Sequence, residues 1–269
     1  MTARARVGLI VPSSNPVIEG YLQRTPVTAR LGIDVLVTRA RVRRIAADDD
    51  ADAQFGAAAL SAAAGLLADA EVSLICWAGT SGCWLGGDQE DAVLARASAA
   101  ACVPVTSSRT ALLAALAEQP GAPLGVLTPY VTEVHDRVVA TVRAAGGTVV
   151  ADRGLGLERN LDFAAIPAAV LEASLRALAS AGAQSLAVVC TNVPGVLPSL
   201  AAAPFTVVDS VLATLWHAAR LTGSYRRPYA DCYRQACAPY LAGPDLAAPD
   251  RGGTERAGVG PAGPRSDAR

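Results

Sequence analysis

The chain has 269 residues, of which 52% are hydrophobic and 17% charged, so it can bury a core as one large domain or as two lobes. This composition excludes intrinsic disorder for most of the chain. The formal net charge of −1 argues against a nucleic-acid-binding protein, which usually carries a basic excess. All 23 basic residues are arginines, and the absence of lysine excludes Schiff-base chemistry and a phosphate-binding loop that depends on lysine.

The N-terminus and the apolar segments predict a cytoplasmic protein with no membrane span. Residues 1–6 lead directly into a strand-like segment, whereas a signal peptide needs a longer apolar region. The stretch 57–71 is rich in alanine but contains Asp69. A cytoplasmic chain keeps its six cysteines reduced. Without a Cys-x-x-Cys pair, and with only His135 and His217, no metal site is expected, and His135 is expected on a solvated helix face.

In chain order, short β-branched segments alternate with Ala- and Leu-rich segments of helical length. Strands are predicted at residues 7–11, 34–38, 72–77, 103–106, 124–127, 148–151, 185–189 and 205–208. Helices are predicted at residues 51–68, 88–101, 110–118, 131–145, 166–181 and 211–221. Because the strands are nearly continuous apolar runs, this alternation predicts an α/β fold with parallel sheets.

The chain also contains two copies of one plan, in the same order. Residues 6–12 are echoed by 123–129, residues 79–81 by 190–192, and Ser108 with 111–116 by Ser210 with 213–218. We therefore expect two pseudo-symmetric α/β lobes, with a ligand site in the crevice where the carboxyl ends of strands from both lobes meet.

These patterns also give a domain plan. The first lobe is predicted to span residues 1–110 and the second 111–210, with a C-terminal helix near 211–241 packing on the first lobe. The stretch 243–269 is rich in glycine and proline and is predicted to be a disordered tail.

Cys190 is the predicted centre of the chemistry, because it stands where an apolar strand ends at the crevice. The backbone N–H groups of Thr191 and Asn192 are expected to surround its sulfur, which would favour the thiolate and form an anion pocket. The alternative is a buried core cysteine, which is common. The position equivalent to Cys190 in the first copy is Gly79, so only one face of a substrate would meet a thiol.

The residues after Gly79 supply polar groups at a similar turn. Thr80 and Ser81 carry hydroxyls that fit an oxyanion site, although Ser81 also fits a helix cap. Tyr130 can donate its O–H to a carboxylate or can simply pack. Further candidate binding residues are Pro12, Ser13, Asn15 and Asn160; Asn15 also fits a helix cap and Asn160 a turn.

These residues carry a resemblance to the aspartate/glutamate racemase superfamily, specifically its branch of maleate cis-trans isomerases and arylmalonate decarboxylases. The resemblance covers roughly residues 5–225 and is carried by residues 8–15, 79–82, 127–130, 190–192 and 213–218. It implies a fold of two pseudo-symmetric α/β lobes and chemistry without a metal or organic cofactor. It also implies that Thr80, Ser81 and Tyr130 hold a carboxylate while Cys190 delivers a proton.

Within this branch, some motifs favour the isomerases and others favour the decarboxylases. The isomerases use two cysteines and resemble the chain at Asn15, Asn160 and residues 190–192, whereas the decarboxylases have a glycine at the position of Gly79. We therefore predict a decarboxylase of a substituted malonate-type diacid. The alternatives are a maleate-type isomerase or racemase acting on a small dicarboxylate, and a non-catalytic ligand-binding descendant. No nucleic-acid or membrane partner is expected, and the sequence leaves homo-oligomerisation open.

Overall fold

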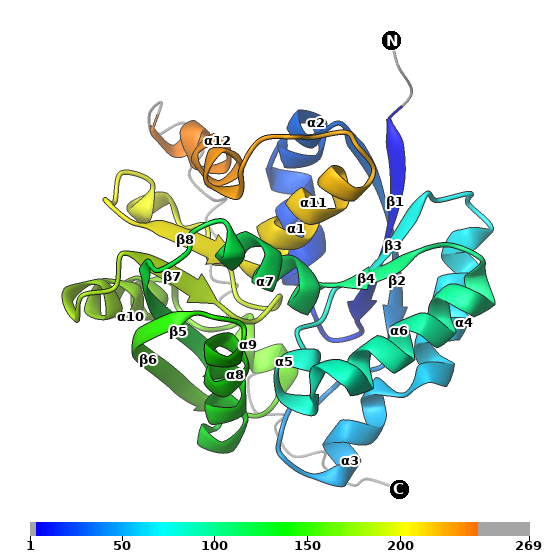
Figure 1. Ribbon diagram of the computed structural model, residues 1–269, viewed down its shortest axis with the longest axis horizontal. Helices are drawn as coiled ribbons and strands as arrows, with labels where there is room; N and C mark the ends of the chain where they lie inside the picture. The colour runs from blue at the N-terminus through cyan, green and yellow to red at the C-terminus, as the bar shows by residue number, and fades with distance from the viewer. Residues whose placement is uncertain (1–3, 242–269) are drawn as a thin grey trace, which may run out of the picture.

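The computed structural model describes residues 4–241, with side chains as far as residue 238. The tail predicted for residues 243–269 lies outside the described residues. The described chain forms two parallel four-stranded sheets with helices around them, so the predicted fold class is confirmed. Figure 1 shows the two lobes next to each other. Helices α4 and α6 lie beside the sheet β1–β4, and helices α8 and α10 lie beside the sheet β5–β8.

Both sheets have the same strand order, which confirms the predicted internal repeat. The first sheet has the order β2-β1-β3-β4 and the second β6-β5-β7-β8. Their strands are β1 (Ala5–Pro12), β2 (Ile33–Ala40), β3 (Leu74–Trp77), β4 (Val105–Ser107), β5 (Pro123–Tyr130), β6 (Thr148–Leu157), β7 (Ser185–Val188) and β8 (Thr206–Asp209). Because the strands are parallel, the carboxyl ends of the central strands β1, β3, β5 and β7 carry the loops that build the crevice.

The helices follow the predicted alternation, with a few additional short elements. They are α1 (Val17–Arg24), α2 (Val27–Leu31), α3 (Asp49–Asp52), α4 (Ala57–Ala68), α5 (Gly82–Leu85), α6 (Gly87–Ala101), α7 (Ser108–Ala117), α8 (Thr132–Ala144), α9 (Asn160–Phe163), α10 (Ala168–Ser180), α11 (Ser210–Leu221) and α12 (Tyr229–Leu241). Asp48, Ser107 and Asp209 cap α3, α7 and α11 by accepting hydrogen bonds from backbone N–H groups of the first turn.

Two predicted elements differ from the structure. The single helix expected at residues 51–68 is interrupted at Gly56, whose ψ of 152° is extended and cannot continue a helix. β6 runs six residues beyond its prediction, because an edge strand tolerates polar, partly exposed residues such as Asp152 and Arg153.

The C-terminal helices connect the lobes. α11 contacts α7, α2 and β3 as well as β8, and it lies between the lobes together with α7 (Figure 1). α12 packs against β8, α11 and the short 3₁₀ helix Pro198–Leu200, and the carbonyl of its Gln235 accepts a hydrogen bond from Arg30 of α2. The packing of a final helix on the first lobe stays a prediction. The exact lobe boundaries stay a prediction.

Among residues 4–241, one mostly helical segment is long and apolar enough to cross a membrane by length and composition. Asp49–Ala68 has a mean hydropathy of 1.2, which differs from the expectation that no segment resembles a span. In the fold, the α4 part of this segment packs against α6 and β2 and also contacts β1 and β3, which accounts for its apolar composition.

Candidate active site

The loops at the carboxyl ends of the central strands enclose one small pocket between the lobes. Its hydrogen-bonding and reactive side is formed by Gly79, Thr80, Ser81, Tyr130, Cys190 and Thr191, with Asn160 at the margin. Its apolar side is formed by Pro12, Val42, Ile45, Phe55, Trp77 and Trp84. Eight of the sequence-predicted site residues therefore line the pocket, whereas Ser13, Asn15 and Asn192 do not.

Cys190 lies two residues after the end of β7 and has only 3% of its surface exposed. Of the two amides predicted to surround its sulfur, that of Asn192 donates to it at 3.4 Å. Burial nevertheless raises the pKa of the Cys190 thiol to about 12, even though hydrogen bonds from Tyr130 and the Asn192 amide act to lower it. The expectation of a stabilised thiolate was wrong, because desolvation outweighs these hydrogen bonds; at neutral pH Cys190 is a protonated thiol.

Thr80 and Tyr130 join the two lobes at the pocket. Thr80 Oγ1 lies 3.1 Å from Tyr130 Oη, and both side chains are buried. Desolvation, with a further contribution from Cys190, raises the pKa of Tyr130 well above its usual value. The phenol therefore keeps its proton, and because one hydroxyl proton bridges the pair, the pair has one further proton that can be donated to an oxyanion.

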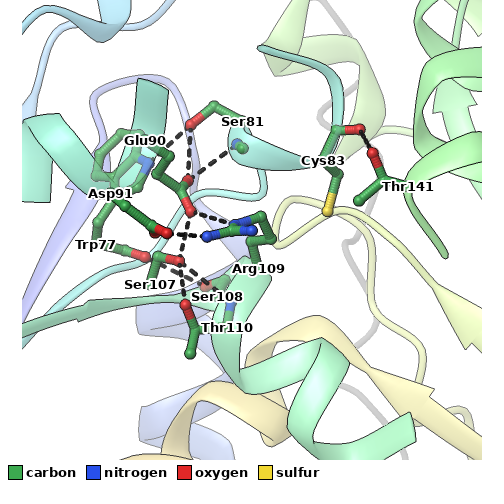
Figure 2. Close-up of polar contacts among 11 residues, drawn as sticks. Trp77, Ser81, Cys83, Glu90, Asp91, Ser107, Ser108, Arg109, Thr110 and Thr141 are labelled. Carbon is green, nitrogen blue, oxygen red and sulfur yellow. Dashed lines mark hydrogen bonds and ion pairs between the residues drawn. The ribbon is translucent and has the colours of Figure 1, made fainter. Parts of the chain in front are cut away.

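The hydroxyl of Ser81 is engaged on the far side of the turn. It accepts a hydrogen bond from Trp77 Nε1 at 3.0 Å and donates to Glu90 Oε1 at 3.4 Å (Figure 2). Because its only proton is directed at Glu90, the hydroxyl cannot donate to a substrate in this arrangement. Among residues 4–241, no acceptor is found for the backbone N–H groups of Thr80 and Ser81, so these amides are the donors that the turn offers to a ligand.

The turn after β1 supports the pocket from behind. Asn15 is fully buried; its Oδ1 accepts from the N–H groups of Val17 and Ile18, and its Nδ2 donates to Thr191 Oγ1 at 3.2 Å. The cap interpretation of Asn15 is therefore correct, and the amide lies behind Thr191 rather than in the pocket lining. Ser13 Oγ bonds to the backbone of Val42, which fixes one wall of the pocket.

Asn160, Thr191 and Asn192 connect the lobes around the pocket. Asn160 Nδ2 donates to Ser14 Oγ at 2.8 Å, and its carbonyl accepts from Asn192 Nδ2 at 2.5 Å. Thr191 Oγ1 donates to the carbonyl of Ala78 at 2.8 Å. These bonds hold the Cys190 turn against the first lobe, so Asn192 acts on the pocket by positioning.

The segment from Val42 to Ile45 contributes to the pocket wall, whereas the arginines of residues 41–44 favour a solvated loop over one that closes on the site. The backbone N–H of Ile45 donates to the carbonyl of Glu158 at 2.8 Å, while that of Asn160 donates to the carbonyl of Arg43 at 2.9 Å. Val42 and Ile45 consequently line the pocket. The arginines dominate this stretch in the sequence, and no local signal shows that the aliphatic residues between them face inward.

A buried ion pair lies behind the Ser81 turn and was also not predicted. Glu90 accepts from the backbone N–H of Gly82 at 2.9 Å. It also accepts from Ser107 Oγ at 2.7 Å and from Arg109 Nε at 2.9 Å (Figure 2). In the sequence Glu90 is one of several acids in the first turn of a helix, where solvated carboxylates are common.

His135 is a correction to the expectation of a solvated side chain. It is 5% exposed, and its ring nitrogens bond to Thr128 Oγ1 at 2.9 Å and Asp152 Oδ1 at 3.0 Å. These contacts tie α8 to β5 and β6 just before Tyr130, so His135 supports the strand that carries the phenol.

This architecture, two like α/β lobes with a buried thiol and hydroxyl donors at their crevice, defines the class of the aspartate/glutamate racemase superfamily, in its maleate isomerase and arylmalonate decarboxylase branch. The family model described as arylmalonate decarboxylase matches residues 52–232, so the chain belongs to that family. No curated protein matches the chain.

Solved structures of both kinds of enzyme are similar in fold. A liganded double mutant of arylmalonate decarboxylase aligns with a TM-score of 0.71 at 20% identity, covering 85% of this chain and 98% of that one. A Cys-to-Ala mutant of the maleate isomerase from Pseudomonas putida S16, with maleate, gives a TM-score of 0.73 at 19% identity, covering 86% and 98%. The third structure is a Cys-to-Ser mutant of the maleate cis-trans isomerase from Nocardia farcinica with a covalently bound succinylcysteine intermediate. It aligns with a TM-score of 0.69 at 24% identity, covering 81% of this chain and 93% of that one.

Proposed function

We propose that the protein is a cofactor-independent decarboxylase of a substituted malonate-type diacid, acting in the cytoplasm. The observation that carries the proposal is the asymmetry of the pocket lining, in which Cys190 is a thiol while its pseudo-equivalent Gly79 has no side chain. One proton donor on one face of the substrate is what decarboxylation followed by protonation requires. Addition of a cysteine to an alkene with a second cysteine assisting would need a second thiol.

In the proposed reaction, one carboxylate of the substrate leaves as CO₂ when its bond to the α carbon breaks. The electron pair stays on the substrate as an enediolate, whose oxygens accept one hydrogen bond from the Thr80–Tyr130 hydroxyl pair and others from the turn amides of Thr80 and Ser81. The Cys190 thiol then transfers its proton to the α carbon. The thiolate left behind takes a proton back from water, as its high pKa in this buried position favours.

The geometry of Asn15 and of the apolar wall supports this reading. A second dicarboxylate-binding amide would favour an isomerase, but Asn15 does not line the pocket, and its Oδ1 and one of its Nδ2 protons are bonded to the protein. The leaving carboxylate would instead lie against Val42, Ile45, Phe55 and Trp84. An apolar environment destabilises the ionised carboxylate relative to neutral CO₂ and so favours its loss.

The size of the pocket bears on the substrate. The cavity measures about 20 Å³, which is less than a malonate-type diacid occupies. Binding therefore requires the wall to move. The aromatic side chains Phe55, Trp77 and Trp84 favour an apolar or aryl substituent on the α carbon.

The second candidate is a maleate-type isomerase or racemase acting on a small dicarboxylate. It is favoured by the intact Thr191-Asn192 turn after Cys190 and by the fold similarity to the two maleate isomerases. In this reading Cys190 acts as the sole nucleophile, which requires its thiolate.

Proton NMR in D₂O with maleate, phenylmalonate, methyl-phenylmalonate and aspartate separates the candidates. The decarboxylase is expected to convert methyl-phenylmalonate to a monoacid with one deuterium at the α carbon. Fumarate formed from maleate would overturn the proposal in favour of the isomerase. Binding of diacids without any conversion would favour the non-catalytic descendant.

The pH profile of the active substrate gives a second test. A thiol with a pKa of about 12 stays protonated, so decarboxylation is expected to be independent of pH between about 7 and 9. An isomerase that needs the thiolate would instead gain about tenfold in rate per pH unit over this range.

A further inference from the structure

The space that a side chain at position 79 would need is filled by the indole of Trp77. A Cβ built on Gly79 would lie 2.4 Å from Cε2, 2.5 Å from Cζ2 and 2.6 Å from Nε1 of Trp77. Carbon atoms in contact prefer separations of about 3.5–4.0 Å. No residue larger than glycine fits at this turn unless the indole moves.

The indole is held firmly where it is. Trp77 is 1% exposed, and its Nε1 donates to Ser81 Oγ, which in turn donates to Glu90. Glu90 is fixed by the backbone N–H of Gly82 and, as Figure 2 shows, by Ser107 and the ion pair with Arg109. Displacing the indole would leave the buried N–H of Trp77 without its partner Ser81, which is costly.

The indole also forms part of the pocket wall. Trp77 lines the pocket beside Gly79, on the first-lobe turn that pairs by pseudo-symmetry with the Cys190 turn of the second lobe. Its one polar hydrogen points to Ser81, so it offers an apolar ring and no proton donor to the substrate.

We propose that Trp77 is the specificity-determining residue that keeps proton delivery on the Cys190 face, because its indole occupies the place of a second acid group at position 79 and closes that face to water. This inference rests on the proposed function for its stereochemical consequence. The packing relation between Trp77 and position 79 is independent of that function.

The packing is tested by a double-mutant cycle in thermal unfolding. Gly79→Ala is expected to lower the Tm by roughly 2–10 °C in the wild-type background. In a Trp77→Leu background the same substitution is expected to lower it by less than half as much, because the obstructing ring is gone. Equal losses in both backgrounds would overturn the inference. If Trp77→Leu does not fold, Trp77→Phe, which replaces the two fused rings of the indole with one phenyl ring, serves in the same cycle.

The stereochemistry is tested with methyl-phenylmalonate and with the enantiopure product acid in D₂O. Gly79→Cys alone is expected to leave the product a single enantiomer, whereas Gly79→Cys with Trp77→Leu is expected to racemise the product acid at least ten times faster than either single variant. Racemisation by Gly79→Cys alone, as fast as by the double variant, would overturn the role of Trp77. Absence of CO₂ release by the wild type would overturn the proposed function instead, while the thermal cycle still decides the packing relation.

Discussion

The two strand-ending turns of the crevice share a backbone plan but are held by different acids. In the first lobe, the backbone N–H of Gly82 is bound by Glu90, which comes from α6 and is paired with Arg109. In the second lobe, the N–H of Gly195 is bound at 2.6 Å by Asp209, which ends β8 and caps α11. No arginine pairs with Asp209 among the described residues.

This difference shows how a repeat can keep its fold while its two sites diverge. The paired acid of the first lobe orders Ser81 and the Trp77 indole, which form an inert wall. The unpaired acid of the second lobe lies near the reactive thiol, where its charge adds to the desolvation that raises the pKa of Cys190. Four substitutions test this asymmetry, from the largest expected effect to the smallest.

Removal of the thiol is expected to have the largest effect. Cys190→Ala should lower kcat for decarboxylation by roughly 100- to 10,000-fold, because the variant has no proton donor at the α carbon. CO₂ release under saturating substrate measures this. Cys102→Ala, which alters an exposed cysteine at the end of α6, is the matched control and should leave kcat unchanged. Activity of Cys190→Ala comparable to that of the wild type would contradict the proposal that Cys190 donates the proton.

Loss of the first-lobe acid is expected to destabilise the fold. Glu90→Ala leaves Arg109 and the N–H of Gly82 without a buried partner, so the free energy of unfolding should fall by about 3–5 kcal/mol. Urea unfolding followed by circular dichroism measures the change. Asp91→Ala removes an exposed partner of the same arginine and should cost less than about 1 kcal/mol. If both variants lose the same stability, the buried pair does not hold the turn.

Asp209, the acid of the second lobe, should make the free energy of unfolding depend on pH. Burial raises the pKa of Asp209 from 3.8 to about 6, so the folded state binds its proton more tightly than the unfolded chain. Its contribution to stability is therefore fully present below about pH 4 and is lost as the pH rises through 6. The loss is roughly 3 kcal/mol. The difference in unfolding free energy between wild type and Asp209→Asn should change by this amount between pH 4 and 7, and a constant difference would contradict the assignment.

The smallest expected effect concerns Asn15. Asn15→Ala removes the cap of α1 and should reduce stability by about 1 kcal/mol, with KM for the diacid changed less than twofold. Asn15→Asp, which keeps the capping oxygen, should recover most of the stability. A large rise in KM in both variants would restore Asn15 as a substrate-binding residue.

The fold was predictable because its signals are local. All eight predicted strands are present, since near-continuous apolar runs such as residues 185–189 identify buried parallel strands. The repeat predicted equivalent strand orders, which the two sheets have. Short helices such as α2 and α9 were not predicted, because a single turn has too few residues to show a helical period.

The site was predictable where a residue lies at a strand end and unpredictable where it reaches the pocket through packing. Cys190, Thr80 and Tyr130 follow or end strands, and they meet as expected. Ile45 and Phe55 come from segments distant in sequence and carry no pattern that marks them as pocket walls. The protonation of Cys190 also escaped prediction, because it depends on the burial that both lobes produce together.

The sequence by itself determined the two-lobed parallel fold, the crevice and the single thiol at its edge. These features depend on the apolar pattern of each strand and on the order of the motifs, which can both be recognised from neighbouring residues in the sequence. Tertiary structure alone decided three further things: that the Cys190 thiol keeps its proton, that the Ser81 hydroxyl faces Glu90, and that the Trp77 indole fills the space beside Gly79. Each of these depends on desolvation or on contact between residues that meet only when the lobes pack, since electrostatic and steric energies are set by neighbours in space.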